Sequence, residues 1–258
     1  ETIYNYLLMR KASRFLTIFL SVVLVGPLLT VFSGAYSFTT DWRTASRESI
    51  GIAPDPESNT GAVVQVYAAR AFNWRGVFAV HSWIAVKPEN AREYTVYQVL
   101  GWNLLRGKST IDSTKSLPDR KWYGAEPKLI ADYRDKEAEK LIPQIVQSIN
   151  EYPYAFDYTL WPGPNSNTFV AHVLREVGGL EVALPVTAIG KDYLGPVRLL
   201  ARAPSGTGWQ FSLGGYFGLT LASREGLEIN VLGAVLGVDF LRPAIKLPGL
   251  GRLGLSAV

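Results

Sequence analysis

The sequence contains no cysteine, two histidines and one methionine among its 258 residues. The absence of cysteine excludes disulfide bonds, thiolate metal sites and a thiol nucleophile. It fits either a periplasmic or a cytoplasmic protein, and it suits a compartment where stray thiols are oxidised. With two histidines and no thiolate we expect no zinc site, whereas a carboxylate-bound calcium ion stays open. The letters Gly249-x-Gly251-x-x-Gly254 match a dinucleotide fingerprint, but too few residues follow to complete a βαβ unit. We therefore predict no metal and no cofactor.

Clusters of basic residues are also missing. The formal net charge is +4, but lysine and arginine are scattered along the chain, so we predict no nucleic-acid partner.

Charged side chains are absent from residues 15–40, and Phe15 to Phe32 is almost wholly apolar. At about 1.5 Å per residue such a helix crosses a bilayer. Because Arg10, Lys11 and Arg14 precede it, we expect a single-pass anchor through residues 15–33, with the N-terminus cytoplasmic and the main domain outside. A cleaved signal peptide is the competing interpretation, since Ser33-Gly34-Ala35 resembles a cleavage site.

The predicted fold class is α+β, with helices and antiparallel strands behind the anchor. Four parts are expected: a cytoplasmic N-terminus and anchor (1–35), a tether (36–61), an α+β domain (62–195) and a Gly-rich β extension (196–258). Strands are expected at 62–69, 77–86 and 93–101, and a polar loop at 103–128. A helix interrupted by Pro143 is expected at 129–150. Short strands are expected at 197–203, 208–213, 217–223 and 227–236, followed by a Pro- and Gly-rich end.

Residues 161–170 (WPGPNSNTFV) are the segment on which a functional hypothesis depends. Asn165 or Ser166 is a suitable N-cap for a helix whose apolar face continues to Gly178-Gly179. A serine in the first turn of a buried helix has backbone N–H groups around it, as a nucleophile with an oxyanion hole requires. An ordinary helix cap has the same appearance, and both interpretations stay open here.

His81 lies in an expected strand and is the candidate general base for Ser166, provided that the strands fold back onto the helix. Gln98 or Tyr97 on the next strand would orient its imidazole; these two point to opposite faces, so only one can do so. Asn165 and Asn167 are the candidate oxyanion or positioning residues. We assign His172 a structural role because it lies on nearly the opposite face of the helix from Ser166. The remaining pocket candidates are Trp83, Tyr97, Trp161, Lys191 and Tyr193, although a surface ion pair and a packed tyrosine explain the last two equally well.

The strand histidine, the polar residue on the next strand and the helix start Asn165-Ser166-Asn167-Thr168-Phe169-Val170 resemble circularly permuted papain-like hydrolases of the NlpC type. That resemblance implies a papain-like sheet with packed helices, with Ser166 where the family has cysteine. Serine needs a well-aligned base, whereas a cysteine near histidine is already partly ionised. A slow hydrolase and a pocket that has lost its reaction are both compatible with this change.

Over a longer stretch the chain is similar to a bacterial membrane-anchored family, domain of unknown function 3750. The similarity rests on Asp41 to Ser49, Val80 to Lys87, Trp161 to Phe169 and Thr187 to Tyr193. It implies the bacterial inner membrane, with the main domain in the periplasm, and it carries no known activity. We expect a Ser-dependent hydrolase or transferase of amide or ester bonds. The alternative is a non-catalytic accessory subunit of a larger inner-membrane protein complex.

Overall fold

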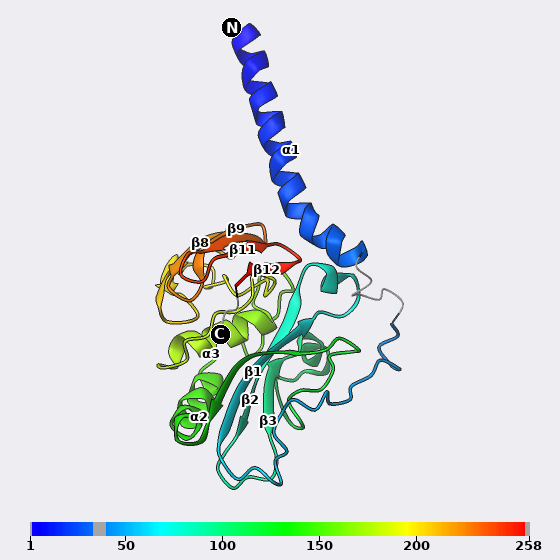
Figure 1. Ribbon diagram of the computed structural model, residues 1–258, viewed down its shortest axis with the longest axis vertical. Coiled ribbons are helices and arrows are strands. Elements are labelled where there is room, and N and C mark those ends of the chain that lie inside the picture. The colour runs from blue at the N-terminus through cyan, green and yellow to red at the C-terminus, as the bar shows by residue number, and fades with distance from the viewer. Residues whose placement is uncertain (1, 33–39, 256–258) are drawn as a thin grey trace.

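The computed structural model describes residues 2–32 and 40–255. Residues 40–255 form the part of the chain that we call the head domain. Helix α1 (Thr2–Phe32) projects from one end of it (Figure 1). Its stretch Tyr4–Phe32 is long and apolar enough to cross a membrane, and little of it is covered by the rest of the chain. The predicted apolar N-terminal helix is therefore confirmed, whereas the cleavage-site-like Ser33-Gly34-Ala35 lies outside the described residues.

A five-stranded antiparallel sheet forms the centre of the head domain. Its spatial order is β4-β3-β2-β1-β5. The strands are β1 (Val63–Arg70), β2 (Val80–Lys87), β3 (Thr95–Val99), β4 (Ile111–Lys115) and β5 (Lys128–Arg134). Two short 3₁₀ turns, η1 (Asn73–Val77) and η2 (Gly101–Arg106), join neighbouring strands.

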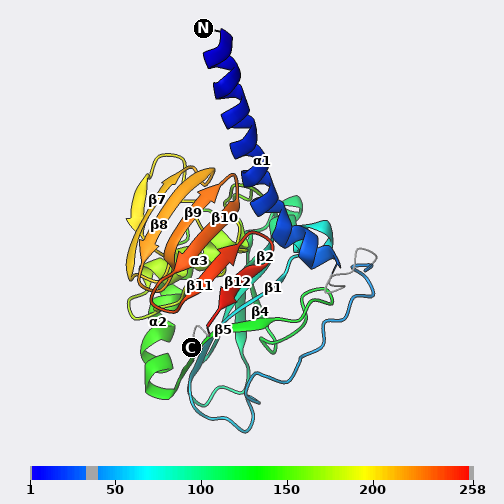
Figure 2. The same cartoon turned by 45° about the horizontal axis from the view of Figure 1, so that its top comes forward.

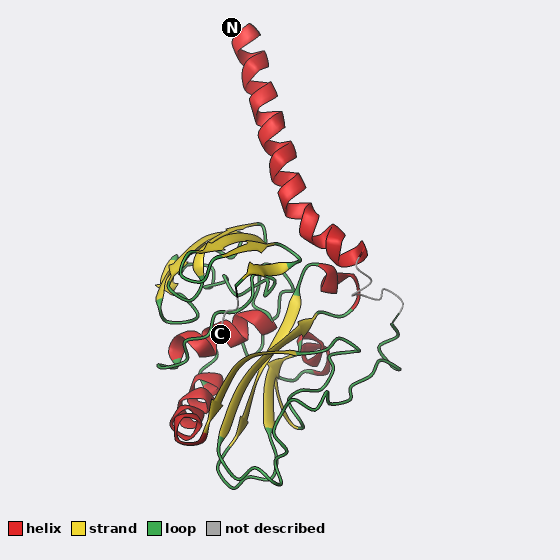
Figure 3. Ribbon diagram, in the orientation of Figure 1, coloured by secondary structure: helices red, strands yellow, loops and turns green. Residues whose placement is uncertain are grey.

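Helices α2 (Asp135–Asn150) and α3 (Ser166–Glu176) cover one face of this sheet (Figure 3). The main core lies between them, where Val66, Ile84 and Val86 pack against Ile145 and Phe169. A second, smaller core on the other face contains Tyr67, Trp83 and Val96. Alternate residues of β2 therefore enter different cores, which fixes the direction of each side chain near His81.

The segment between α1 and β1 is fixed against the second face by Asp119. This carboxylate accepts hydrogen bonds from the Ser49 hydroxyl at 2.6 Å and from the backbone N–H groups of Ile52 and Ala53 at 2.7 and 3.1 Å. Because Asp119 itself is fully buried, the described part of the expected tether is an integral part of the head domain.

The C-terminal part is a seven-stranded antiparallel meander, whose spatial order follows the sequence from β6 to β12 (Figure 2). Its strands are β6 (Leu200–Arg202), β7 (Gly208–Leu213), β8 (Phe217–Ala222), β9 (Gly226–Val231), β10 (Ala234–Asp239), β11 (Ala244–Leu247) and β12 (Gly251–Gly254). The predicted combination of helices with antiparallel sheets behind an apolar helix is thus confirmed.

Three local predictions were wrong. The expected helix at 129–150 begins only at Asp135, because Lys128–Arg134 pairs with β1 as an edge strand. The expected loop at 103–128 contains β4, another edge strand, whose polar sequence resembles a loop. Pro143 does not interrupt α2, whose buried residues on both sides of the proline hold the helix against the sheet.

The single strand expected at 227–236 is two strands joined by a tight turn. Leu232 and Gly233 both have positive φ angles, 54° and 87°, as a two-residue hairpin turn requires. The Pro- and Gly-rich end also contains regular structure, since β11 and β12 complete the meander.

Candidate functional site

The loop that leads into α3 is held by Asn165. Its side-chain oxygen accepts hydrogen bonds from the backbone N–H groups of Asn167 at 2.9 Å and Thr168 at 3.1 Å. Its amide nitrogen donates to the carbonyls of Leu160 at 3.0 Å and Ile189 at 3.1 Å. The Thr168 hydroxyl completes the capping box by accepting from the Asn165 N–H. One side chain therefore fixes both the helix start and two flanking loops.

Ser166 is the first residue of α3. It precedes Phe169 and Val170 by three and four residues, and residues at this spacing share one face of a helix. Both are fully buried in the main core, so Ser166 is on the side of α3 that faces the sheet. Ser166 is buried. Within residues 2–32 and 40–255 its hydroxyl makes no hydrogen bond, whereas the neighbouring Asn165, Asn167 and Thr168 are all bonded.

Asn167 ties the start of α3 to β2. Its side-chain oxygen accepts from the Ser82 hydroxyl at 2.8 Å, and its amide donates to the carbonyls of Val80 at 2.9 Å and Ile189 at 2.8 Å. The Asn167 backbone N–H donates to the Asn165 cap, so Asn167 acts here as a positioning residue. Because Ser82 points towards α3, the adjacent His81 points towards the second core.

His81 belongs to a hydrogen-bonded chain that runs across three strands. Its Nε2 lies 2.9 Å from Oε1 of Gln98, and Nε2 of Gln98 donates to the Asp112 carboxylate at 3.1 Å. Since an ionised carboxylate only accepts, Asp112 fixes which end of the Gln98 amide faces His81. Gln98 therefore presents its oxygen, the His81 proton is on Nε2, and Nδ1 keeps a free lone pair.

His81 is neutral over most of the pH scale. Burial lowers the pKa of its imidazole to about 4, and the hydrogen bond that His81 donates to Gln98 offsets only part of that shift. The pairing between β2 and β3 ends at Ile84 and Tyr97, so β3 does not pair with the first residues of β2. The His81–Gln98 bond joins the two strands there.

Aromatic rings surround the imidazole on the second face. His81 stacks on Trp122, with ring centroids 3.7 Å apart and an interplanar angle of 11°, and Trp83 lies 5.8 Å away. A cavity of about 290 Å³ lies beside this stack. Its lining combines rings (Trp83, Trp102, Trp122 and Tyr123), the Gln98 amide and cationic side chains (Arg47, Arg120 and Lys121). Such a lining suits a ligand that has a flat apolar part and a negative charge.

The other residues expected at the site lie elsewhere. Tyr97 packs against the main core, so of the two candidates to orient His81 only Gln98 bonds to it. Trp161 contacts Tyr216, and Tyr193 contacts Tyr154. Lys191 is fully buried and paired with Glu228, so it is not part of a surface ion pair. His172 packs edge-on against Tyr152 at 5.4 Å, between α2 and α3.

Asp112 and Trp122 were not identified from the sequence as site residues. Both belong to the stretch expected to be a loop, and only the pairing of β4 with β3 places Asp112 opposite Gln98. The run Arg120 to Tyr123 also belongs to that stretch; it covers the second face of the sheet and lines the cavity.

The arrangement brings together an orienting chain, a neutral imidazole and an aromatic cavity. It does not join the two residues predicted as nucleophile and base: Ser166 lies on the face of the sheet that α3 covers, whereas His81 points to the other face, and among the described residues the two share no hydrogen bond. No group of three or more metal-ligating side chains occurs in the part of the chain that the structure describes.

Comparison with known proteins gives a match to a protein family. A family model described as protein of unknown function (DUF3750) matches residues 61–193, which is more than half of the chain. The matched range contains the five-stranded sheet, α2, α3 and the cavity-lining segment. No curated protein and no solved structure matches the chain.

Proposed function

The chain belongs to the DUF3750 family, whose description names no activity, and from its own residues we propose a membrane-anchored hydrolase or transferase of amide or ester bonds. The observation that carries this proposal is the chain Asp112–Gln98–His81. It fixes the tautomer that leaves Nδ1 free to accept a proton, which is the orienting role of the third member of a catalytic triad.

The proposal places the head domain outside the cytoplasmic membrane. The basic residues Arg10, Lys11 and Arg14 precede the apolar part of α1, and the positive-inside rule keeps that end in the cytoplasm. The head would then face the periplasm of a bacterium. The proposed scaffold is a permuted papain-like one, supported by a helix that opens with Asn165-Ser166 and packs on the strand that carries His81.

In the proposed reaction the Ser166 Oγ attacks the carbonyl carbon of the substrate while its proton passes to Nδ1 of His81. The tetrahedral intermediate collapses, the leaving amine or alcohol takes that proton, and an acyl-serine remains. Water or a second amine or alcohol then attacks the acyl-serine, His81 again accepts the proton, and Ser166 recovers it as the acid product, or the new amide or ester, departs. Because Ser166 and His81 lie on opposite faces of the sheet, the step requires the start of β2 to rearrange when substrate binds, so that the Ser166 hydroxyl reaches Nδ1.

The aromatic cavity is the proposed substrate subsite. Arg47, Arg120 and Lys121 line it together with the tryptophans, so an acidic group on the substrate would be favoured there. Anchoring to the membrane makes a cell-wall or lipid-derived acyl compound the expected substrate class.

The test is covalent labelling of the purified full chain by a fluorophosphonate, which reacts only with an activated serine. We expect Ser166→Ala to abolish labelling and His81→Ala to reduce it by about 10²-fold or more, as loss of a general base does. Ser58→Ala is the matched control, because Ser58 is exposed and lies in the segment before β1. Failure of the folded natural chain to label at Ser166 would contradict the proposal.

The second candidate is a non-catalytic subunit of an inner-membrane assembly. It is favoured by the missing hydrogen bond between Ser166 and His81 and by the Trp122 ring that covers His81 at 3.7 Å. Sizing the protein after gentle solubilisation of its native membrane separates the candidates. A larger complex together with no labelling supports the subunit, whereas a monomer that labels at Ser166 supports the enzyme.

A further inference from the structure

The outer face of the seven-stranded sheet is apolar although it is exposed. In β7 the residues Trp209, Phe211 and Leu213 point outward, and in β8 the residues Phe217, Leu219 and Leu221 do so. This pattern continues to the last strand, where Leu253 is outward and 48% exposed. Soluble domains rarely expose contiguous apolar surfaces of this kind.

The strand register makes the surface continuous. One cross-strand row runs through Trp209, Leu221, Leu227, Val238, Ile245 and Leu253. A second runs through Leu200, Phe211, Leu219, Ile229 and Leu236. Residues in such rows touch their neighbours, so the two rows together form one apolar sheet surface rather than scattered side chains.

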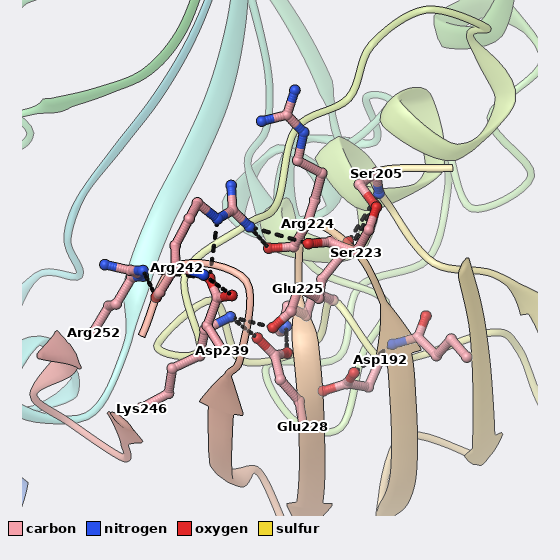
Figure 4. Close-up of polar contacts among 12 residues, drawn as sticks. Asp192, Ser205, Ser223, Arg224, Glu225, Glu228, Asp239, Arg242, Lys246 and Arg252 are labelled. Carbon is pink, nitrogen blue, oxygen red and sulfur yellow. Dashed lines mark hydrogen bonds and ion pairs between the residues drawn. The ribbon is translucent and has the colours of Figure 1, made fainter. Parts of the chain in front are cut away.

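The inner face of the same sheet is polar. Glu228 pairs there with Lys246 (Figure 4) and with Lys191. Asp192 accepts from the Asn230 amide at 3.2 Å. All five side chains are buried, and each is bonded to at least one of the others. The alternation is thus the reverse of that in a water-soluble sheet, whose apolar face is the buried one.

We propose that this apolar sheet surface docks on the membrane leaflet from which α1 emerges, with its side chains at the boundary between headgroups and acyl chains. The inference rests on the proposed role of α1 as a membrane anchor. It adds a second, monotopic contact, whose strength scales with buried apolar area as for interfacial helices.

The contact between α1 and the sheet supports lipid as the occupant. Gly26 lies so close to the turn between β11 and β12 that an added Cβ would be 2.0 Å from the Pro248 carbonyl oxygen. Thr30 Oγ1 donates to the Gly249 carbonyl at 3.3 Å. From Phe15, the first residue after the basic cluster, the helix extends for about 17 Å to Gly26, which is less than the thickness of the hydrocarbon core. The turn between β11 and β12 therefore meets α1 within its apolar span, and Figures 1 and 2 show the sheet and the helix at the same end of the head domain.

The charges around the sheet favour anionic phospholipid. The acidic side chains of residues 196–255 are Glu225, Glu228 and Asp239, and all three are buried. Arginines lie in the segments that border the apolar surface (Arg198, Arg202, Arg224, Arg242 and Arg252). Arg202 lies over the ring of Trp209 at 4.5 Å, the combination of aromatic ring and cation found at membrane interfaces.

The natural sequence lacks cysteine, so single cysteines can be spin-labelled without other changes. The full chain is reconstituted, one copy per nanodisc, in lipid that contains phosphatidylglycerol. We expect labels at Leu219→Cys and Ile245→Cys to collide more with oxygen than with a water-soluble nickel complex. A label at Glu139→Cys, exposed on α2, should show the opposite order, and a label at Leu20→Cys on α1 should be lipid-buried.

Each outcome is decisive. If the Leu20 label is in lipid while the sheet labels resemble the Glu139 label, docking is wrong and the anchor stands. If the Leu20 label is in water, the anchor itself is wrong, and the inference fails with it. If labels at Leu219 are shielded from both reagents and show spin–spin coupling between copies in larger discs, a second copy covers the surface and lipid docking is overturned.

Discussion

Lys191 and Glu228 form a completely buried ion pair that joins the loop after α3 to β9 in the middle of the seven-stranded sheet. Lys246 of β11 reaches the second carboxylate oxygen of Glu228 at 2.6 Å. Burial acts to raise the pKa of Glu228, but the two ammonium groups outweigh it and the pKa is lowered. The last residues of the family-matched range are thus bound to a sheet outside that range.

Removal of Glu228 should be strongly destabilising. Glu228→Gln leaves two buried ammonium groups without their carboxylate, and breaking a buried pair costs about 3–5 kcal/mol. The measurement is the free energy of unfolding of the full chain in detergent micelles, followed by tryptophan fluorescence. Arg224→Gln is the control, because its pair with Glu181 is exposed and should change that free energy by less than about 1 kcal/mol. Equal effects of the two substitutions would contradict this account.

The sequence predicts the parts of the fold that depend on local pattern. The long apolar helix, the first strands and the helix after the Asn165 cap follow from hydropathy and capping. The edge strands β4 and β5 do not, because their residues are half exposed and polar, and only pairing with β3 and β1 makes them strands. Apolar and polar residues alternate along β7 and β8 in the sequence too. The sequence does not indicate that the polar face is the buried one, because this depends on the packing of Lys191 and Asp192 against that face.

The candidate site shows the same division. The Asn165 cap follows from local sequence, whereas the relation of His81 to Ser166 depends on which face of β2 the imidazole occupies. Period-two alternation predicts that His81 and Trp83 share one face of β2. It does not predict which face α3 covers; the bond between Ser82 and Asn167 shows that it is the opposite one. Gln98 was separable from Tyr97 only through the strand register.

Asn165 should be more important for stability than an ordinary cap. Asn165→Ala removes the acceptor for two N–H groups and the donor to Leu160 and Ile189. We expect a loss of about 2–4 kcal/mol in unfolding free energy, the sum of a cap and of unpaired buried carbonyls. Asn165→Asp keeps the cap and loses only the donors, so it should lie between Asn165→Ala and the natural chain. An Asn165→Asp variant as unstable as Asn165→Ala would show that the cap is unimportant.

The ring nitrogen of His81 that carries the proton should depend on Asp112, although the two side chains do not touch. In Asp112→Leu the Gln98 amide loses the carboxylate that fixes its orientation, and it can present either end to Nε2. We expect ¹⁵N NMR shifts of the imidazole to change from a pure Nε2–H tautomer to a mixture. Because the chain has two histidines, the signals can be assigned with His172→Gln. Asp112→Asn is the conservative comparison, since its side-chain oxygen still accepts from Gln98. An unchanged pure tautomer in Asp112→Leu would mean that Gln98 is fixed by other groups.

Acid should destabilise the head domain through His81. Burial lowers its pKa from 6.5 in the unfolded chain to about 4 in the folded chain. Between pH 4 and pH 6.5 the imidazole is therefore protonated in the unfolded chain and neutral in the folded chain. The stabilising contribution is complete above pH 6.5 and is lost as the pH falls to 4, with a total of about 3 kcal/mol. His81→Gln should remove this part of the slope of unfolding free energy against pH. His172→Gln should keep it and remove only the smaller part due to His172, whose pKa burial also lowers. Identical slopes for the natural chain and His81→Gln would show that His81 is hydrated and titrates normally in the folded protein.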